Sequence, residues 1–146
     1  MIARRSHAVW VVCSFGALLA IGCNGSGTTS SGAVRFEDGS PVSSGSVELR
    51  NLSDKKRYAS RIAPDGSFTL ADENGTVGIP AGSYEAVIVQ IVLTEDLPPE
   101  LHTHGHTVPR RYADYYTSGL TVDLAEGQTT PIEIVVEALE QESHGH

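Results

Sequence analysis

The chain has 146 residues, of which 40% are hydrophobic and 19% charged, and a formal net charge of −8. This length allows one ordinary domain, and the composition is typical of a globular chain rather than a disordered one. The acidic balance excludes nucleic acid as a partner, because the chain would repel phosphate backbones, and surface charge alone would not bind it to anionic lipid.

Residues 1–22 are predicted to be a signal peptide. Arg4 and Arg5 give a positive start, and residues 8–21 are then uncharged and mostly apolar (AVWVVCSFGALLAI). This order is typical of an export signal. As a helix the apolar stretch would span about 21 Å, short of the roughly 30 Å hydrocarbon core, so a permanent transmembrane helix is the weaker interpretation.

Two cysteines stand in this region, and we expect different fates for them. Cys13 lies inside the apolar stretch and would be discarded with it. The stretch ends LAIGC and resembles the lipobox of bacterial lipoproteins, in which a small residue, here Gly22, precedes the lipidated cysteine, here Cys23. Ala20 departs from the usual pattern, which has leucine at that position. The resemblance implies cleavage between Gly22 and Cys23 and acyl chains on Cys23, and the alternative is ordinary cleavage that leaves a free thiol.

Residues 23–32 are predicted to be the lipidated Cys23 and a flexible tether, because the sequence NGSGTTSSG has no apolar side chain. Acyl chains on Cys23 make the membrane the first expected partner. Asn24 stands where a retention signal in some bacteria has aspartate. We therefore expect an exported protein anchored in the cell envelope, in the outer membrane and facing the periplasm or the cell surface.

Residues 33–139 are predicted to form an all-β domain. Apolar and polar side chains alternate in several runs, as in strands with one buried face: 34–36, 47–49, 68–70, 120–124 and 132–136. The run 84–93 (YEAVIVQIVL) is apolar on both faces, which predicts a long central strand covered on both sides. The turn Ala63-Pro64-Asp65-Gly66 is predicted to join residues 58–62 to 67–70 as a hairpin. Seven such strands indicate an antiparallel β-sandwich.

Three motifs in order carry a resemblance to a known domain. They are a strand followed by Asp-Gly-Ser-Pro-Val at 38–42, Pro-Asp-Gly-Ser-Phe at 64–68, and Gly-Ile-Pro-Ala-Gly-Ser-Tyr at 78–84. Together they cover residues 32–90 and resemble a carboxypeptidase regulatory-like domain. The resemblance implies a seven-stranded transthyretin-like (prealbumin-like) sandwich with a non-catalytic accessory or binding role.

A loop is predicted over residues 94–117, and loops of that length are usually functional or disordered. Its second half gathers cations and aromatic rings, which are frequent in binding sites and on sugar-binding surfaces: Arg110, Arg111, Tyr112, Tyr115 and Tyr116. One hypothesis is therefore a carbohydrate- or polymer-binding module. The interpretation that we favour is that these tyrosines pack over the outer face of the long strand, because that face needs a cover.

The same loop carries His102, His104 and His106 at alternating positions. On an extended segment the three imidazoles would share a face and suit zinc or copper, which gives a third hypothesis, a metal-binding lipoprotein. The alternative is a solvated loop, which the nearby prolines and glycine favour, and we expect no cofactor. Residues 140–146 are predicted to be a disordered tail that contains two further histidines.

Catalytic motifs are not evident. The chain ends Glu-Ser-His-Gly-His and lacks the terminal Tyr-Arg-Gly-Ser of transthyretin-like hydroxyisourate hydrolases, and no nucleophile elbow precedes a helix. The two lysines, Lys55 and Lys56, lie beside Asp54 in a polar hairpin loop, which is unsuited to a buried isopeptide crosslink. We expect a lipid-anchored module, not an enzyme, with a binding or envelope-structural role toward an envelope protein or a polysaccharide.

Overall fold

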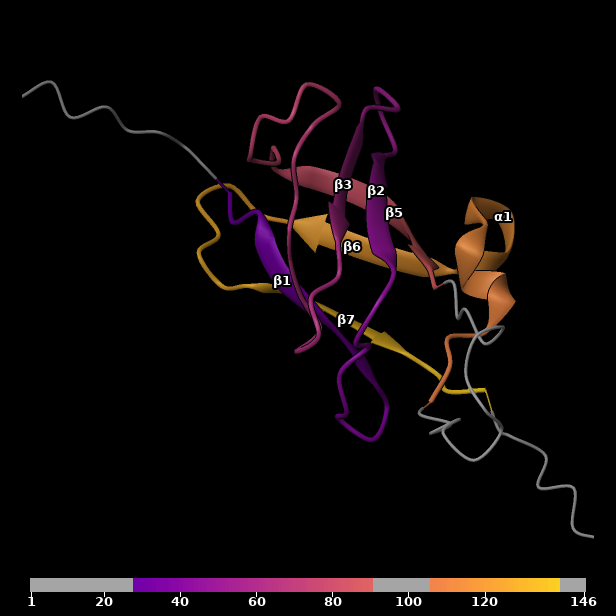
Figure 1. Cartoon of the computed structure of the whole chain (residues 1–146). Coiled ribbons are helices and arrows are strands. Elements are labelled where there is room, and N and C mark those ends of the chain that lie inside the picture. Colours follow the sequence, from indigo (N-terminus) through magenta and orange to yellow (C-terminus); the bar gives the residue numbers. More distant parts are fainter. Residues whose placement is uncertain (1–27, 91–105, 140–146) are drawn as a thin grey trace, which may run out of the picture.

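The structure is a computed structural model that describes residues 28–90 and 106–139. These residues form seven strands: β1 (Ser31–Phe36), β2 (Ser46–Asn51), β3 (Arg57–Arg61), β4 (Ser67–Thr69), β5 (Gly82–Val89), β6 (Leu120–Leu124) and β7 (Ile132–Val136). A 3-10 helix, η2 (Arg110–Ala113), and a one-turn helix, α1 (Tyr115–Ser118), precede β6 (Figure 1). Each of the seven predicted strands is present.

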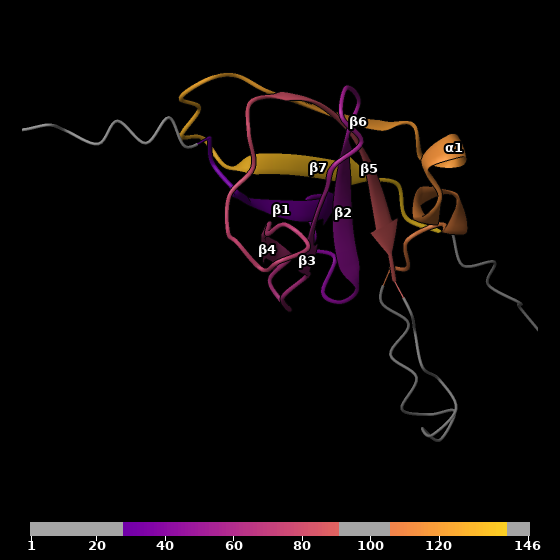
Figure 2. The same cartoon turned by 90° about the horizontal axis from the view of Figure 1, so that it is seen from above.

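The strands form two sheets, with the orders β4-β1-β7 and β3-β2-β5-β6. Figures 1 and 2 show the two sheets as separate layers. Alternate side chains of both sheets fill the space between them, including the fully buried Val34 and Val136 of the first sheet and Leu49, Tyr84 and Ile88 of the second. The prediction of an all-β sandwich is confirmed, and the period-two patterns mark the faces that meet in this core.

One strand pair differs from the predicted antiparallel arrangement. β1 and β7 run parallel, with Val34 opposite Ile134 and Phe36 opposite Val136. A parallel pair needs a crossover connection, and here the chain forms β2 to β6 before it returns to pair as β7. Alternation of apolar residues reports which face of a strand is buried but not the direction of its neighbour, so the prediction of a wholly antiparallel sandwich was wrong at this pair.

The predicted turn after β3 is present, but the strands on either side of it do not form one ladder. The Gly66 amide donates to the Ala63 carbonyl oxygen (2.8 Å), and the Ala63 amide donates to the Ser67 carbonyl oxygen (2.9 Å). Gly66 has a φ of +84°, and a Cβ there would lie 2.6 Å from the Val34 carbonyl oxygen, so this position requires glycine. β3 and β4 belong to different sheets, so the turn carries the chain across the sandwich.

The fold begins earlier in the chain than predicted. Thr28 pairs with Ile79 in an isolated bridge, the Thr29 amide donates to the Gln128 carbonyl oxygen (2.9 Å), and β1 starts at Ser31. Residues 28–32, predicted as the end of the tether, are therefore part of the domain. The sequence between Cys23 and the fold is shortened to residues 24–27.

Candidate functional site

The best candidate for a functional surface is the outer face of the sheet β3-β2-β5-β6, together with η2 and α1, which pack against β5 (Figures 1 and 2). Part of the predicted loop 94–117 is thus helical, from Arg110 onward. Val87 lies between two core residues of β5 and points to the outer face, yet it is only 6% exposed. The favoured expectation, that Tyr112, Tyr115 and Tyr116 pack over the second face of the long strand, is confirmed for Tyr115 alone, because Tyr112 is buried in the core and Tyr116 is 95% exposed. β5 ends at Val89, and predicted strand residues 91–93 lie outside the described residues.

Short local signals position this cover. The Asp114 side chain caps α1 by accepting a hydrogen bond from the Tyr116 amide (2.7 Å), and Gly119, with a φ of +66°, ends the helix. The buried Ser118 hydroxyl donates to the Ala86 carbonyl oxygen of β5 (2.5 Å) and accepts from the Leu120 amide (3.2 Å). The Ser118 hydroxyl thus links β5 to β6 where their pairing ends, and it holds α1 against the edge of the sheet.

Tyr112 and Arg111 connect η2 to the other sheet. The Tyr112 ring is buried in the core, 5% exposed, and its hydroxyl accepts from the Glu137 amide (3.2 Å) just after β7. The Arg111 guanidinium lies over this ring, donates to its hydroxyl (2.8 Å) and pairs with the Glu137 carboxylate (2.6 Å). Both residues are engaged in holding the helical segment to the sandwich.

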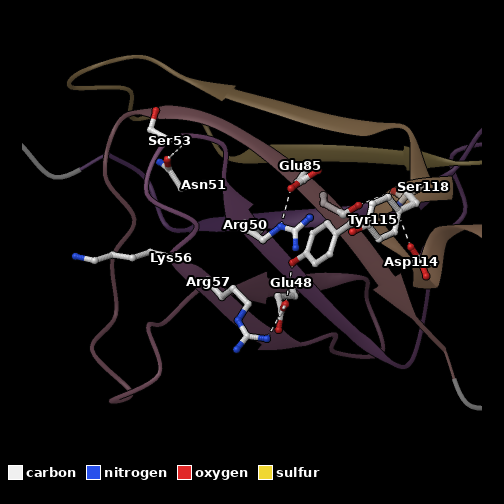
Figure 3. A network of polar contacts seen from close by, with 12 residues as sticks. Glu48, Arg50, Asn51, Ser53, Lys56, Arg57, Glu85, Asp114, Tyr115 and Ser118 are labelled. Atoms are coloured by element: carbon white, nitrogen blue, oxygen red, sulfur yellow. Dashed lines mark hydrogen bonds and ion pairs between the residues drawn. The ribbon is translucent and has the colours of Figure 1, made fainter.

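Tyr115 lies over the outer face and closes a polar network there (Figure 3). Its hydroxyl donates to the Glu48 carboxylate (2.8 Å), and the Arg50 guanidinium lies 3.9 Å from its ring centroid. Arg50 in turn pairs with Glu85 on the neighbouring strand (2.6 Å). The sequence gives one signal for Glu48, Arg50 and Glu85, namely polar residues alternating with core residues, but it does not indicate that these side chains meet Tyr115.

The contacts of this network shift the pKa values of its members. Burial raises the pKa of Tyr115, and the hydrogen bond to Glu48 raises it further, so the phenol is neutral at physiological pH. The hydrogen bond with Glu85 raises the pKa of Arg50. Each charged group of this network thus faces an opposite charge or the hydroxyl or ring of Tyr115.

Two members of the predicted ligand-binding set remain available on the surface. Arg110 is exposed, and Tyr116 is 95% exposed, in contrast to Tyr112 and Tyr115. Arg111 is exposed as well, but its guanidinium is paired with Glu137.

Of the three histidines of the metal hypothesis, His106 lies among the described residues. Its Nε2 lies 3.0 Å from an Asp38 carboxylate oxygen, and its ring packs on Phe36 with 5.4 Å between centroids. His102 and His104 lie outside the described residues. Within residues 28–90 and 106–139 no three histidine, cysteine or carboxylate side chains gather as metal ligands. Zinc or copper binding by His102, His104 and His106 stays a prediction.

A hollow of about 560 Å³ opens beside the edge strand β3. Its lining combines opposite charges, with the cations Lys55, Lys56 and Arg57 and the carboxylates Glu48, Asp72 and Glu73. Arg57 lies 3.9 Å from Glu48, so the hollow adjoins the network under Tyr115. The outer face therefore offers a continuous polar surface from β3 to α1.

Comparison of the chain with protein-family models, with curated proteins and with solved structures finds no match. The resemblance to carboxypeptidase regulatory-like domains therefore rests on its three motifs and stays a prediction. Among the described residues no helix is long and apolar enough to cross a membrane. Gly22 and Cys23, the predicted cleavage and lipidation residues, lie outside the described residues.

Proposed function

We propose that this protein is a lipid-anchored, exported β-sandwich module with a non-catalytic binding or envelope-structural role, built on a transthyretin-like arrangement of strands. The observation that carries the proposal is the junction between the signal and the fold. An uncharged, mostly apolar stretch ends just before Gly22-Cys23, and Thr28, five residues after Cys23, is already packed on the sandwich. An acylated Cys23 at this position would place a folded domain directly at the membrane.

The outer face supports a binding role rather than catalysis. Its charged side chains pair with one another, as in Arg50 with Glu85 and Arg57 with Glu48. Catalytic groups need pKa values matched to proton transfer near neutral pH, whereas the pKa of Tyr115 is shifted away from that range. A surface of paired charges with a protruding aromatic ring suits contact with a polymer or a protein.

Removal of the lipidation residue tests the anchor. We expect wild-type protein in the membrane fraction and a Cys23→Ala variant in the soluble fraction, because one thiol holds the acyl chains. Cys13→Ala is the matched control, since Cys13 lies in the part of the signal that is discarded. Retention of Cys23→Ala in membranes would contradict the proposal, and release of Cys13→Ala would assign the effect to export instead.

The 95% exposure of Tyr116 favours a second candidate, a carbohydrate- or polymer-binding module centred on Arg110 and Tyr116. Aromatic planes at a protein surface stack on sugar rings and expend little conformational entropy. A glycan array with the exported chain should show ligands retained by wild type and lost by Tyr116→Ala. Leu52→Ala, which changes an exposed apolar side chain elsewhere, is the control. No glycan retained by wild type would remove this candidate.

A further inference from the structure

The place where the chain enters the fold defines one end of the sandwich. Thr28 lies beside Ile79, and the connections at the same end are the β2–β3 hairpin (52–56), the segment 71–81 and the β6–β7 connection (125–131). The strand registers show that these connections lie at one end. Asn51 at the end of β2 is opposite Tyr84 near the start of β5. Gly82, the first residue of β5, is opposite Leu124 at the end of β6. We call these connections the anchor end.

Two of the exposed large apolar side chains lie at the anchor end. Leu52 is 45% exposed and Val77 is 62% exposed. The Leu52 amide donates to the Ser83 carbonyl oxygen (3.0 Å) at the start of β5, and Val77 is two residues from Ile79, the partner of Thr28. Both side chains therefore project from the surface that surrounds the entry point of the chain.

The tether limits how far this end can lie from an acylated Cys23. Five residue steps separate Cys23 from Thr28, which can span at most about 18 Å. The eight-residue β5 gives the sandwich a length of about 26 Å along its strands. A domain turned end over end would hold Thr28 farther from the membrane than the tether reaches.

The charges at the anchor end are mixed. Lys55 and Lys56, the two lysines of the chain, are in the hairpin, and Lys56 extends away from the sheet (Figure 3). The same connections carry four carboxylates, Asp54, Asp72, Glu73 and Glu126, and the Asp72 carboxylate accepts from two backbone amides of its own loop. The lysines can reach lipid phosphates, whereas the net charge gives no strong attraction, so the covalent anchor must supply most of the membrane affinity.

We propose that the anchor end rests on the membrane surface, with Leu52 and Val77 at headgroup depth and Lys55 and Lys56 among the lipid phosphates. This inference rests on the proposed lipidation of Cys23. In this orientation the opposite end of the sandwich, which carries the turn after β1 and the residues around His106, faces away from the membrane. The partner that we assign to the anchor end is the phospholipid surface that holds the acyl chains.

Single cysteine variants of the full, processed lipoprotein test the orientation, because Cys13 is discarded and Cys23 is blocked by lipid. Leu52→Cys, Val77→Cys and the control Glu37→Cys each receive a fluorophore. Glu37 is exposed and directly follows β1, at the opposite end. The proteins are incorporated into vesicles of phosphatidylethanolamine and phosphatidylglycerol that contain a headgroup-labelled quencher lipid.

The labels at residues 52 and 77 should be quenched at least about twofold more strongly than the label at residue 37, because they lie at headgroup depth. A Gly-Ser insertion of about 12 residues after Gly25 extends the maximum reach of the tether by roughly 40 Å and should reduce this difference. Equal quenching at both ends in protein that floats with the vesicles would overturn the orientation alone.

Two other outcomes would also overturn the proposal. If the processed protein carries no acyl chain and does not float with vesicles, the proposed function fails and the orientation fails with it. If the labels at residues 52 and 77 are protected from aqueous iodide but not quenched by lipid, the anchor end contacts a second copy of the chain instead.

Discussion

Tyr115 allows a direct test of how the helical cover is held on the sheet. Tyr115→Phe removes the hydroxyl that donates to Glu48 (2.8 Å) and keeps the ring that lies under the Arg50 guanidinium. A hydrogen bond to a charged acceptor contributes about 1.5–3 kcal/mol. The Glu48 side chain is 32% exposed, so water replaces part of the bond, and we expect a loss of about 1–2 kcal/mol in the free energy of unfolding.

The effect of pH on this variant has a defined sign. Burial and the hydrogen bond to Glu48 raise the pKa of Tyr115 in the folded chain above its ordinary value of 10.0. The stabilising contribution is therefore fully present below pH 10 and is lost as the pH rises through the folded-state pKa, because the unfolded phenol ionises first. Above pH 10 the wild-type chain should lose stability more steeply than Tyr115→Phe.

Urea denaturation of the purified protein, followed by circular dichroism, measures both effects. Tyr116→Phe is the control, since its side chain is 95% exposed, and its free energy of unfolding should stay within about 0.5 kcal/mol of wild type. Glu48→Gln completes a double-mutant cycle, with an expected coupling of about 1 kcal/mol to Tyr115→Phe. If Tyr115→Phe were as stable as Tyr116→Phe, the contact with Glu48 would not hold the cover, and the reasoning would be refuted.

Three further predictions concern stability. Gly66→Ala should lower the free energy of unfolding by at least about 2 kcal/mol. Gly39→Ala is the control, because Gly39 has the same φ of +84° but open space around its Cβ, and it should cost about 1 kcal/mol. Equal costs in urea titrations would argue against the clash at residue 66. Ser118→Ala should cost about 1–3 kcal/mol because it leaves two backbone groups unsatisfied, whereas the exposed Ser43→Ala should cost less than about 0.5 kcal/mol. Similar melting temperatures for the two variants would contradict this. Hydrogen bonds from Ser67 lower the pKa of Asp65 in the folded chain, so its contribution to folding stability is present above pH 3.8 and is lost as the pH falls through the folded-state pKa. Asp65→Asn should therefore flatten the acid limb of a plot of stability against pH. An unchanged acid limb would contradict this role of Asp65.

The strands and their buried faces could be predicted from the sequence because a strand's period of two is a local property. Each apolar alternation, such as Val47 and Leu49, marked a strand and the face that it buries. The pairing of strands is not local. The parallel contact between β1 and β7 joins residues about a hundred positions apart, and nothing in either segment encodes the direction of its partner.

The sequence predicts that a segment covers the outer face of β5, but not which tyrosine of that segment does so. The apolar outer position Val87 indicates that something must lie over the strand, and Tyr115 does so. Which tyrosine is buried and which is exposed depends on the turn of α1, which Asp114 and Gly119 begin and end. The opposite fates of Tyr115 and Tyr116 therefore follow from helix geometry, which a reading of 94–117 as a loop cannot supply.

The central claim is that Cys23 carries lipid and joins it to the sandwich through four residues. The most direct measurement is the intact mass of the processed protein from membranes, with fragmentation of its N-terminal peptide. We expect a chain that begins at Cys23, with a mass above that of the polypeptide by its acyl chains, all located on that residue. A chain that begins elsewhere, or a Cys23 with a free thiol, would contradict it.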